Sequence, residues 1–227
     1  MSVTIAPHCT AARPAGHPFP EVGVTAGLAA CSRPTTLLSM ESDAEVFIES
    51  LTRLFGAEDV IRKIDSTKPK LPPVSLFVYH NLPEDGMVTA VTYGLSYAKH
   101  PDWKIGTAEL IVTVNGDDES FGLATAFFAE RYRGDSPFSF GNVFTMEEPI
   151  SEKSAMSGFF VFMPSFLDMP QATIELPSKK VFLKGMYPIY RGEAALFDEI
   201  GLEKFWHLDG YDMYDTNRAD LSKPNKP

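Results

Sequence analysis

One segment, residues 105–114, constrains the fold of this chain more than any other. Its run Leu110-Ile111-Val112 is not interrupted by a polar residue. Such a run is typical of a strand that is covered on both faces. Asn115-Gly116-Asp117-Asp118 follows it and is typical of a turn that ends the strand. The pattern therefore predicts a sheet with this strand near its centre.

Two helices are predicted from their end signals. Residues 119–132 have acidic residues at the start, Arg131 and Arg133 at the end, and apolar residues around most of the circumference, so we expect a well-covered helix. Ser42-Asp43-Ala44-Glu45 is a capping box, and the apolar residues after it follow helical spacing. Gly56 is expected to end that helix.

The other apolar segments predict further strands. Residues 74–80 alternate between two faces, and a Pro-Glu-Asp-Gly turn separates them from residues 87–93, so this pair is expected to form a hairpin. We expect more strands at residues 142–146, 158–163, 172–176 and 180–186, and a last helix at 192–208. This order of elements predicts an α+β fold with a mostly antiparallel sheet and helices packed against it.

The two ends of the chain differ in composition from residues 40–208. Residues 1–39 hold five prolines and three charged residues and show no apolar period, so we expect a disordered or wrongly assigned leader, with Met40 as the alternative start. Leu28-Ala29-Ala30-Cys31 imitates a lipoprotein cleavage box, but Glu21 and the lack of a basic region argue against a secretory leader. Residues 209–227 are polar and are expected to fray.

The composition disfavours several classes of function. The chain has 20 Lys and Arg against 30 Asp and Glu, a formal net charge of −10, and so is poorly suited to nucleic acid or an anionic membrane. No apolar run approaches the roughly 20 residues that a membrane-spanning helix needs. Both cysteines, Cys9 and Cys31, precede residue 40, so the rest of the chain holds no disulfide framework and no cysteine nucleophile. A reducing cytoplasm is compatible with this distribution.

One segment, Gly94-Leu95-Ser96-Tyr97-Ala98, resembles the nucleophile elbow of serine hydrolases. It directly follows the strand 87–93, and His207 stands where a Ser–acid–His order would need it, so a small serine hydrolase is the alternative function. An elbow requires a helix straight after the serine, and Pro101 argues against a helix here. A turn at the end of a strand is the preferred interpretation.

Neither a metal nor a cofactor is indicated. His100 beside Asp102 is an insufficient ligand set, and no two histidines after residue 40 have the spacing of a metal motif. Residues 115–120 look like the start of a calcium loop but lack its glycine and its bidentate glutamate. There is no glycine-rich phosphate loop. We therefore expect no metal, no cofactor and no catalytic residues.

A series of short motifs, taken in order, points to a known family. Tyr93-Gly94-Leu95-Ser96 at a strand end is followed by Gly106-Thr107-Ala108-Glu109-Leu110-Ile111-Val112 and by a phenylalanine-rich helix at 123–132. After them come Phe144-Thr145, Pro149-Ile150-Ser151, residues 158–164, Phe182-Leu183-Lys184-Gly185, Pro188-Ile189-Tyr190 and Glu193. Over roughly residues 42–208 the chain resembles the Suppressor-of-fused domain family, in particular its compact bacterial members.

The resemblance implies a single domain with a mixed sheet flanked by helices, and no known catalytic activity. Animal members clamp a short segment of a transcription factor as an added strand, and bacterial members are often found among immunity proteins that neutralise toxins. We therefore expect a non-enzymatic protein-binding module in the cytoplasm, an immunity or sequestering protein whose partner is a basic toxin or effector. The candidate contact residues, all on predicted loops, are Tyr97, Asp102, Trp103, Asp117 and Asp118.

Overall fold

The structure is a computed structural model and describes residues 41–223. The expectations for residues 1–39 lie outside the described part. In chain order the elements are α1 (Asp43–Phe55), β1 (Val60–Ile64), β2 (Val74–His80), β3 (Met87–Tyr93), the short 3-10 helix η1 (Leu95–Tyr97), β4 (Thr107–Asn115), α2 (Ser120–Tyr132), β5 (Val143–Thr145), β6 (Gly158–Phe162), β7 (Thr173–Glu175), β8 (Lys180–Ile189), α3 (Arg191–Ile200) and α4 (Leu202–Trp206).

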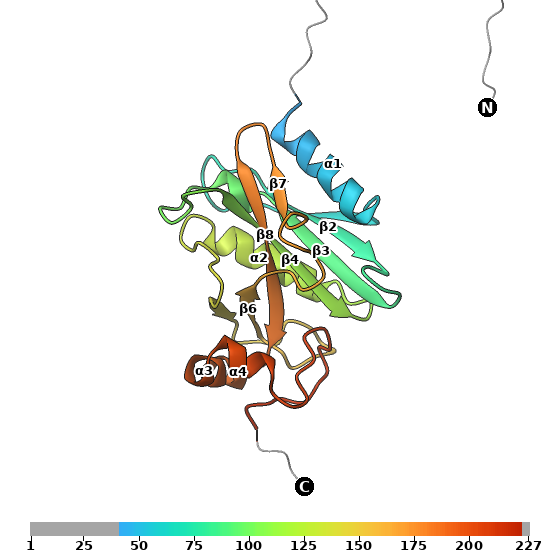
Figure 1. Ribbon diagram of the computed structural model, residues 1–227, viewed down its shortest axis with the longest axis vertical. Helices are drawn as coiled ribbons and strands as arrows, with labels where there is room; N and C mark the ends of the chain where they lie inside the picture. Colours follow the sequence, from blue (N-terminus) through green and yellow to red (C-terminus); the bar gives the residue numbers. More distant parts are fainter. Residues whose placement is uncertain (1–40, 224–227) are drawn as a thin grey trace, which may run out of the picture. The chain divides into compact units, whose positions relative to one another are not determined.

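The strands form one mixed sheet in the order β1-β2-β3-β4-β8-β6-β5, with β7 beside the first half of β8 (Figure 1). All neighbouring strands are antiparallel except β4 and β8, which are parallel. The predicted α+β fold with a mixed, mostly antiparallel sheet flanked by helices is confirmed, as are the hairpin of β2 and β3 and the central place of β4.

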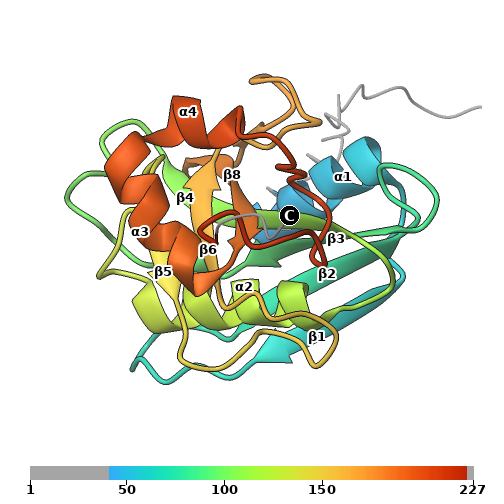
Figure 2. The same cartoon turned by 90° about the horizontal axis from the view of Figure 1, so that it is seen from below.

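Helices cover both faces of the sheet (Figure 2). Helix α2 packs on one face over a cluster that includes Leu76, Leu110 and Val112. On the other face, α1 packs over a cluster that includes Phe77 and Ile111, and α3 and α4 cover the far end of β6 and β8. Because adjacent residues of a strand point to opposite faces, the apolar run of β4 supplies both clusters.

Helix α1 has the predicted ends. The Ser42 hydroxyl accepts a hydrogen bond from the Glu45 amide at 3.3 Å, and the Glu45 carboxylate accepts one from the Ser42 amide at 2.7 Å. Gly56 follows the helix with a φ of 86°, in the region that favours glycine. The capping box and the glycine stop are therefore confirmed.

Two expectations about elements are wrong, and one about helix coverage holds. The strand β1 is missing from the prediction because Val60–Ile64 carries charged residues on an exposed sheet edge and shows no clear apolar pattern. The helix expected at 192–208 is two helices, since Gly201 with a φ of 80° interrupts it. Helix α2 is well covered, as predicted, since eight of its 13 residues are buried, and only a narrow stripe with Leu123 and Phe127 is exposed.

The expectation that the chain frays from Asp209 is also wrong. Residues 209–223 pack on the domain, with Arg218 buried in an ion pair with Glu193 of α3. The Asn115 amide at the end of β4 donates to the Tyr214 carbonyl oxygen at 2.9 Å. A polar sequence remains ordered here because its polar groups find buried partners.

Candidate functional site

The turn after β3 is built around a buried carboxylate. Glu109 is fully buried, and its two oxygens accept hydrogen bonds from the Gly94 amide at 2.8 Å, the Ser96 amide at 2.9 Å and the Thr92 hydroxyl at 2.7 Å. Gly94 has a φ of 143°, and a Cβ there would lie 2.9 Å from the Pro73 carbonyl oxygen. The Gly-Leu-Ser motif is thus a turn fixed by Glu109 and by close backbone approach.

Ser96 and His207 do not form a catalytic pair in the structure. The turn continues into the 3-10 helix η1 and then into irregular chain, without the helix that an elbow requires. Ser96 is 2% exposed, and its hydroxyl has no hydrogen-bond partner among the described residues. His207 Nδ1 donates to the Glu203 carbonyl oxygen at 2.7 Å. Ser96 therefore lacks both a general base and access for a substrate in this conformation.

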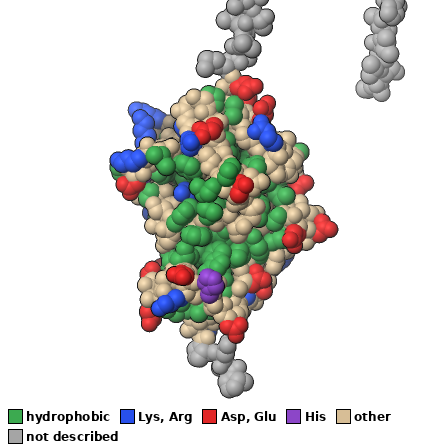
Figure 3. All heavy atoms as spheres, in the orientation of Figure 1, with side chains coloured by type: hydrophobic (Ala, Val, Ile, Leu, Met, Phe, Trp, Pro, Cys, Tyr) green, Lys and Arg blue, Asp and Glu red, His purple; other side chains and the backbone are tan. Residues whose placement is uncertain are grey.

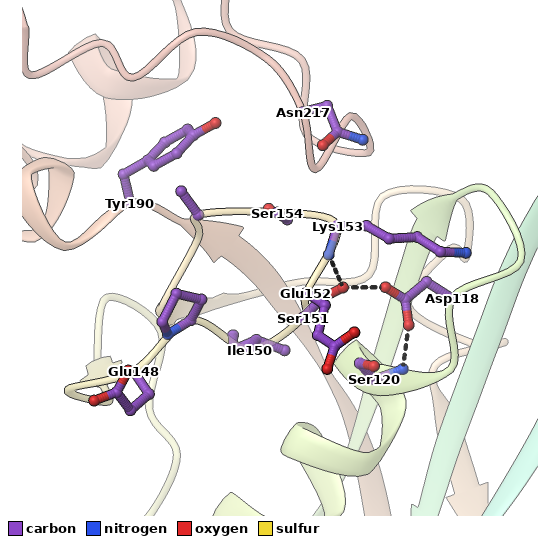
Figure 4. Close-up of a pocket in the computed structure, with 12 residues that line it drawn as sticks. Asp118, Ser120, Glu148, Ile150, Ser151, Glu152, Lys153, Ser154, Tyr190 and Asn217 are labelled. Atoms are coloured by element: carbon purple, nitrogen blue, oxygen red, sulfur yellow. Dashed lines mark hydrogen bonds between the residues drawn. The ribbon is translucent and has the colours of Figure 1, made fainter.

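A large, open depression of the described surface lies next to Asp118. It is an open cavity of about 850 Å³, which we call the Asp118 cavity. Figure 4 shows that its lining comes from the turn between β4 and α2, the loop at 148–155, the junction of β8 and α3, and the C-terminal segment. The lining residues with polar side chains are Asp118, Ser120, Glu148, Ser151, Glu152, Lys153, Ser154, Tyr190 and Asn217.

Asp118 is held in place by hydrogen bonds. Its carboxylate accepts one from the Ser120 amide at 2.9 Å and one from the Ser151 hydroxyl (Figure 4). Partial burial by itself would raise the pKa of Asp118, but these hydrogen bonds outweigh burial and lower the pKa below the ordinary value. The group is therefore an oriented carboxylate at neutral pH.

The charge of the Asp118 cavity is negative. Three carboxylates line it, from Asp118, Glu148 and Glu152, against the single ammonium of Lys153. The Lys153 ammonium is 3.2 Å from the Asp117 carboxylate and is therefore already paired. The cavity has the charge and the room to accept a cationic side chain.

Of the five residues singled out in the sequence, Asp118 lines this cavity. Its neighbour Asp117 lines a separate depression with His80, Asn81 and Gly86, and is linked to the Asp118 cavity only by its ion pair with Lys153. Asp102 and Trp103 line a different depression of about 160 Å³, where the Trp103 indole donates to the Pro137 carbonyl oxygen at 3.0 Å. Tyr97 is separate from both, with its ring under the Lys179 ammonium at 4.4 Å. The five residues thus do not form one surface.

The contributions of Glu148, Glu152, Tyr190 and Asn217 to the cavity were not predicted. The sequence contains the pair Glu147-Glu148, but the only signal there was charge, which is usual on an exposed loop. Asn217 reaches the cavity because the C-terminal segment packs back on the domain. Long-range packing of this kind leaves no local pattern.

Two further classes of site can be assessed within residues 41–223. No group of three or more His, Cys, Asp or Glu side chains in this range is arranged to hold a metal ion. None of the helices described there has both the length and the apolar character to cross a bilayer.

Comparisons with known proteins agree on one family. The family model described as Suppressor of fused protein (SUFU) matches residues 70–219, about two thirds of the 227-residue chain. No curated protein sequence matches the chain.

Solved structures with the same fold come from bacteria and animals. A SUFU homolog from Neisseria gonorrhoeae matches with a TM-score of 0.60 and 17% identity, over 80% of this chain and 97% of that one. A structure of a Sufu–Fu complex matches with a TM-score of 0.57 and 12% identity, over 80% of this chain and 92% of that one. Drosophila Suppressor of Fused matches with a TM-score of 0.55 and 12% identity, over 78% of this chain and 50% of the Drosophila chain.

Proposed function

Because the chain belongs to the Suppressor of fused family, we propose that it is a non-enzymatic protein-binding module that sequesters a basic partner protein in the cytoplasm. An immunity protein that neutralises a basic toxin or effector is the form of this function that we favour. The observation that carries the proposal is the Asp118 cavity, an open depression with three carboxylates and one ammonium that is already paired.

The physical argument starts from charge. A chain with a net charge of −10 attracts a basic partner at long range, which raises the rate of encounter. At short range, the oriented Asp118 carboxylate presents an acceptor to a lysine or arginine side chain of the partner. The Sufu–Fu structure is named as a complex of two proteins, which supports protein binding as the type of activity.

The first experiment is a pull-down from the native host with the full chain as bait, washed at rising salt concentration, with mass spectrometry as the readout. We expect a stoichiometric basic partner that is released as salt rises, because salt screens contacts between exposed charges. The identified partner is then produced and assayed alone and with the chain. Loss of the partner's activity on binding would support sequestration.

The role of the cavity is tested with Asp118→Asn, which keeps the shape of the side chain and removes its charge. A hydrogen bond to a charged group is worth about 1.5–3 kcal/mol, so we expect binding to weaken between about tenfold and a hundredfold. Asp135→Asn is the matched control, since Asp135 is an exposed aspartate paired with Lys68 outside the cavity. Equal binding by both variants, or an acidic partner insensitive to salt, would contradict the proposal.

A further inference from the structure

A second depression lies on a different part of the surface and shares no lining residue with the Asp118 cavity. It consists of two adjoining hollows, of about 160 Å³ and about 30 Å³, which meet at Phe182 and Lys184 of β8. We call it the Lys184 groove. Its main side chains are those of Trp103, Ile105, Phe140, Met169, Phe182 and Lys184.

The groove forms where β8 changes its neighbour. β7 pairs with β8 as far as Phe182, and β6 pairs with it from Gly185 onward, so Lys184 has no paired residue on that side of β8. Gly106 lets the Phe182 ring lie against the backbone, because a Cβ at position 106 would be 2.6 Å from the ring. The hollow is therefore a consequence of the strand arrangement.

The groove concentrates exposed hydrophobic surface. Ile105 is 81% exposed, Met169 52% and Phe140 46%, and all three line it. Figure 3 shows, on the face with α1, that hydrophobic side chains gather across the middle of the molecule, with both acidic and basic side chains around them. Clustered exposed apolar side chains are typical of protein contact surfaces.

The Lys184 ammonium lies inside this apolar surface, and no carboxylate of residues 41–223 forms an ion pair with it. Its Nζ lies 4.3 Å from the centre of the Phe140 ring and 5.7 Å from the centre of the Phe182 ring. Burial lowers the pKa of Lys184, and no carboxylate of residues 41–223 contributes to that shift. Asp102 also lines the groove, but its carboxylate lies 3.9 Å from His100 Nδ1 and forms no ion pair with Lys184.

An unpaired, partly desolvated cation costs free energy in the isolated protein. This cost is unusual in a chain that has 30 carboxylates available for pairing. The missing partner is a carboxylate, and the surrounding rings and aliphatic side chains favour apolar groups on either side of it. A cavity of about 150 Å³ holds a benzene ring, so the larger hollow has room for one aromatic or branched side chain.

We propose that the Lys184 groove binds a peptide segment of a partner protein in which an Asp or Glu stands beside an aromatic or large aliphatic residue. The carboxylate pairs with Lys184, and its apolar neighbour enters the hollow between Trp103, Ile105 and Phe182. This contact is independent of the basic segment assigned to the Asp118 cavity, and it does not rest on that assignment.

The test is a selection from a displayed library of random 12-residue peptides against the full chain. The enriched peptides are synthesised, and their dissociation constants are measured for wild type, Lys184→Gln and Lys180→Gln. Lys180 is the matched control, because it lies on the same strand and its ammonium already pairs with Glu175 at 2.6 Å. We expect peptides with an acidic residue next to an apolar one, bound at least tenfold more weakly by Lys184→Gln and less than twofold more weakly by Lys180→Gln.

Three results would overturn the inference. The first is enrichment of peptides that lack an acidic residue next to an apolar one. If those peptides are basic and their binding depends on Asp118, they support only the Asp118 cavity as a binding site. The second is equal binding of the selected peptides to wild type and Lys184→Gln. The third is a wild-type dimer in sedimentation velocity that Lys184→Glu converts to a monomer, which would assign the groove to a second copy of the chain. Thermal unfolding of each variant confirms that the domain is intact.

Discussion

The buried ion pair between Arg218 and Glu193 gives the sharpest stability prediction. Both side chains are buried, and the guanidinium donates to the carboxylate at 2.5 and 2.8 Å. The same carboxylate also accepts hydrogen bonds from the Tyr190 amide at 3.0 Å and the Leu221 amide at 2.9 Å. Glu193 thus joins the start of α3 to the C-terminal segment, and Arg218 supplies its counter-charge.

Replacing Arg218 with Met leaves the Glu193 carboxylate buried without a cation. Breaking a buried pair in this way costs about 3–5 kcal/mol of the free energy of unfolding. For a domain of this size, 1 kcal/mol shifts Tm by about 2–4 °C, so we expect a fall of roughly 6–20 °C. Urea unfolding followed by circular dichroism measures the free energy, and a thermal scan measures Tm.

Two further variants complete this test. Glu193→Gln combined with Arg218→Met should lose less stability than Arg218→Met alone, because the unpaired charge is then absent. Lys153→Met removes one member of the exposed pair with Asp117 and should change stability by less than about 1 kcal/mol. A loss below about 1 kcal/mol for Arg218→Met would refute the view that this pair anchors the C-terminal segment.

Three other predictions concern single positions. A fluorophosphonate probe should not label Ser96 in the folded chain, because the hydroxyl is buried and has no general base beside it among the described residues. Labelling that mass spectrometry detects, and that Ser96→Ala abolishes, would support the serine hydrolase alternative. Gly106→Ala should destabilise the domain and weaken selected peptides, since the new Cβ would lie 2.6 Å from the Phe182 ring; unchanged unfolding and binding would contradict this. Because the pKa of Asp118 is lowered in the folded chain, its contribution to stability is complete above the unfolded pKa of about 3.9 and is lost as pH falls through the folded pKa. Between about pH 5 and pH 2, wild type should therefore lose more stability than Asp118→Asn. Parallel stability curves for the two proteins in urea unfolding would argue against this role of Asp118.

Local patterns in the sequence determined most of the secondary structure. The alternation of β2, the apolar run of β4 and the capping box before α1 each reflect interactions between residues close in the chain, so they could be read from it. Edge strand β1 could not be predicted from the sequence, because a strand on an exposed edge has few buried positions and therefore no clear alternation of apolar residues. Its pairing with β2 is decided by the rest of the sheet.

Tertiary structure alone decided where the candidate surfaces lie. The sequence drew attention to Asp117 and Asp118, but the Asp118 cavity also needs the loop at 148–155 and Asn217, which come from distant parts of the chain. Lys184 appeared in the sequence only within a family motif. The role proposed for it rests on the lack of a nearby carboxylate among residues 41–223, which depends on how β6, β7 and β8 meet. The burial of a side chain and its ion pairing depend on contacts with residues far apart in the chain. Local sequence patterns therefore do not reveal them, and only the folded structure does.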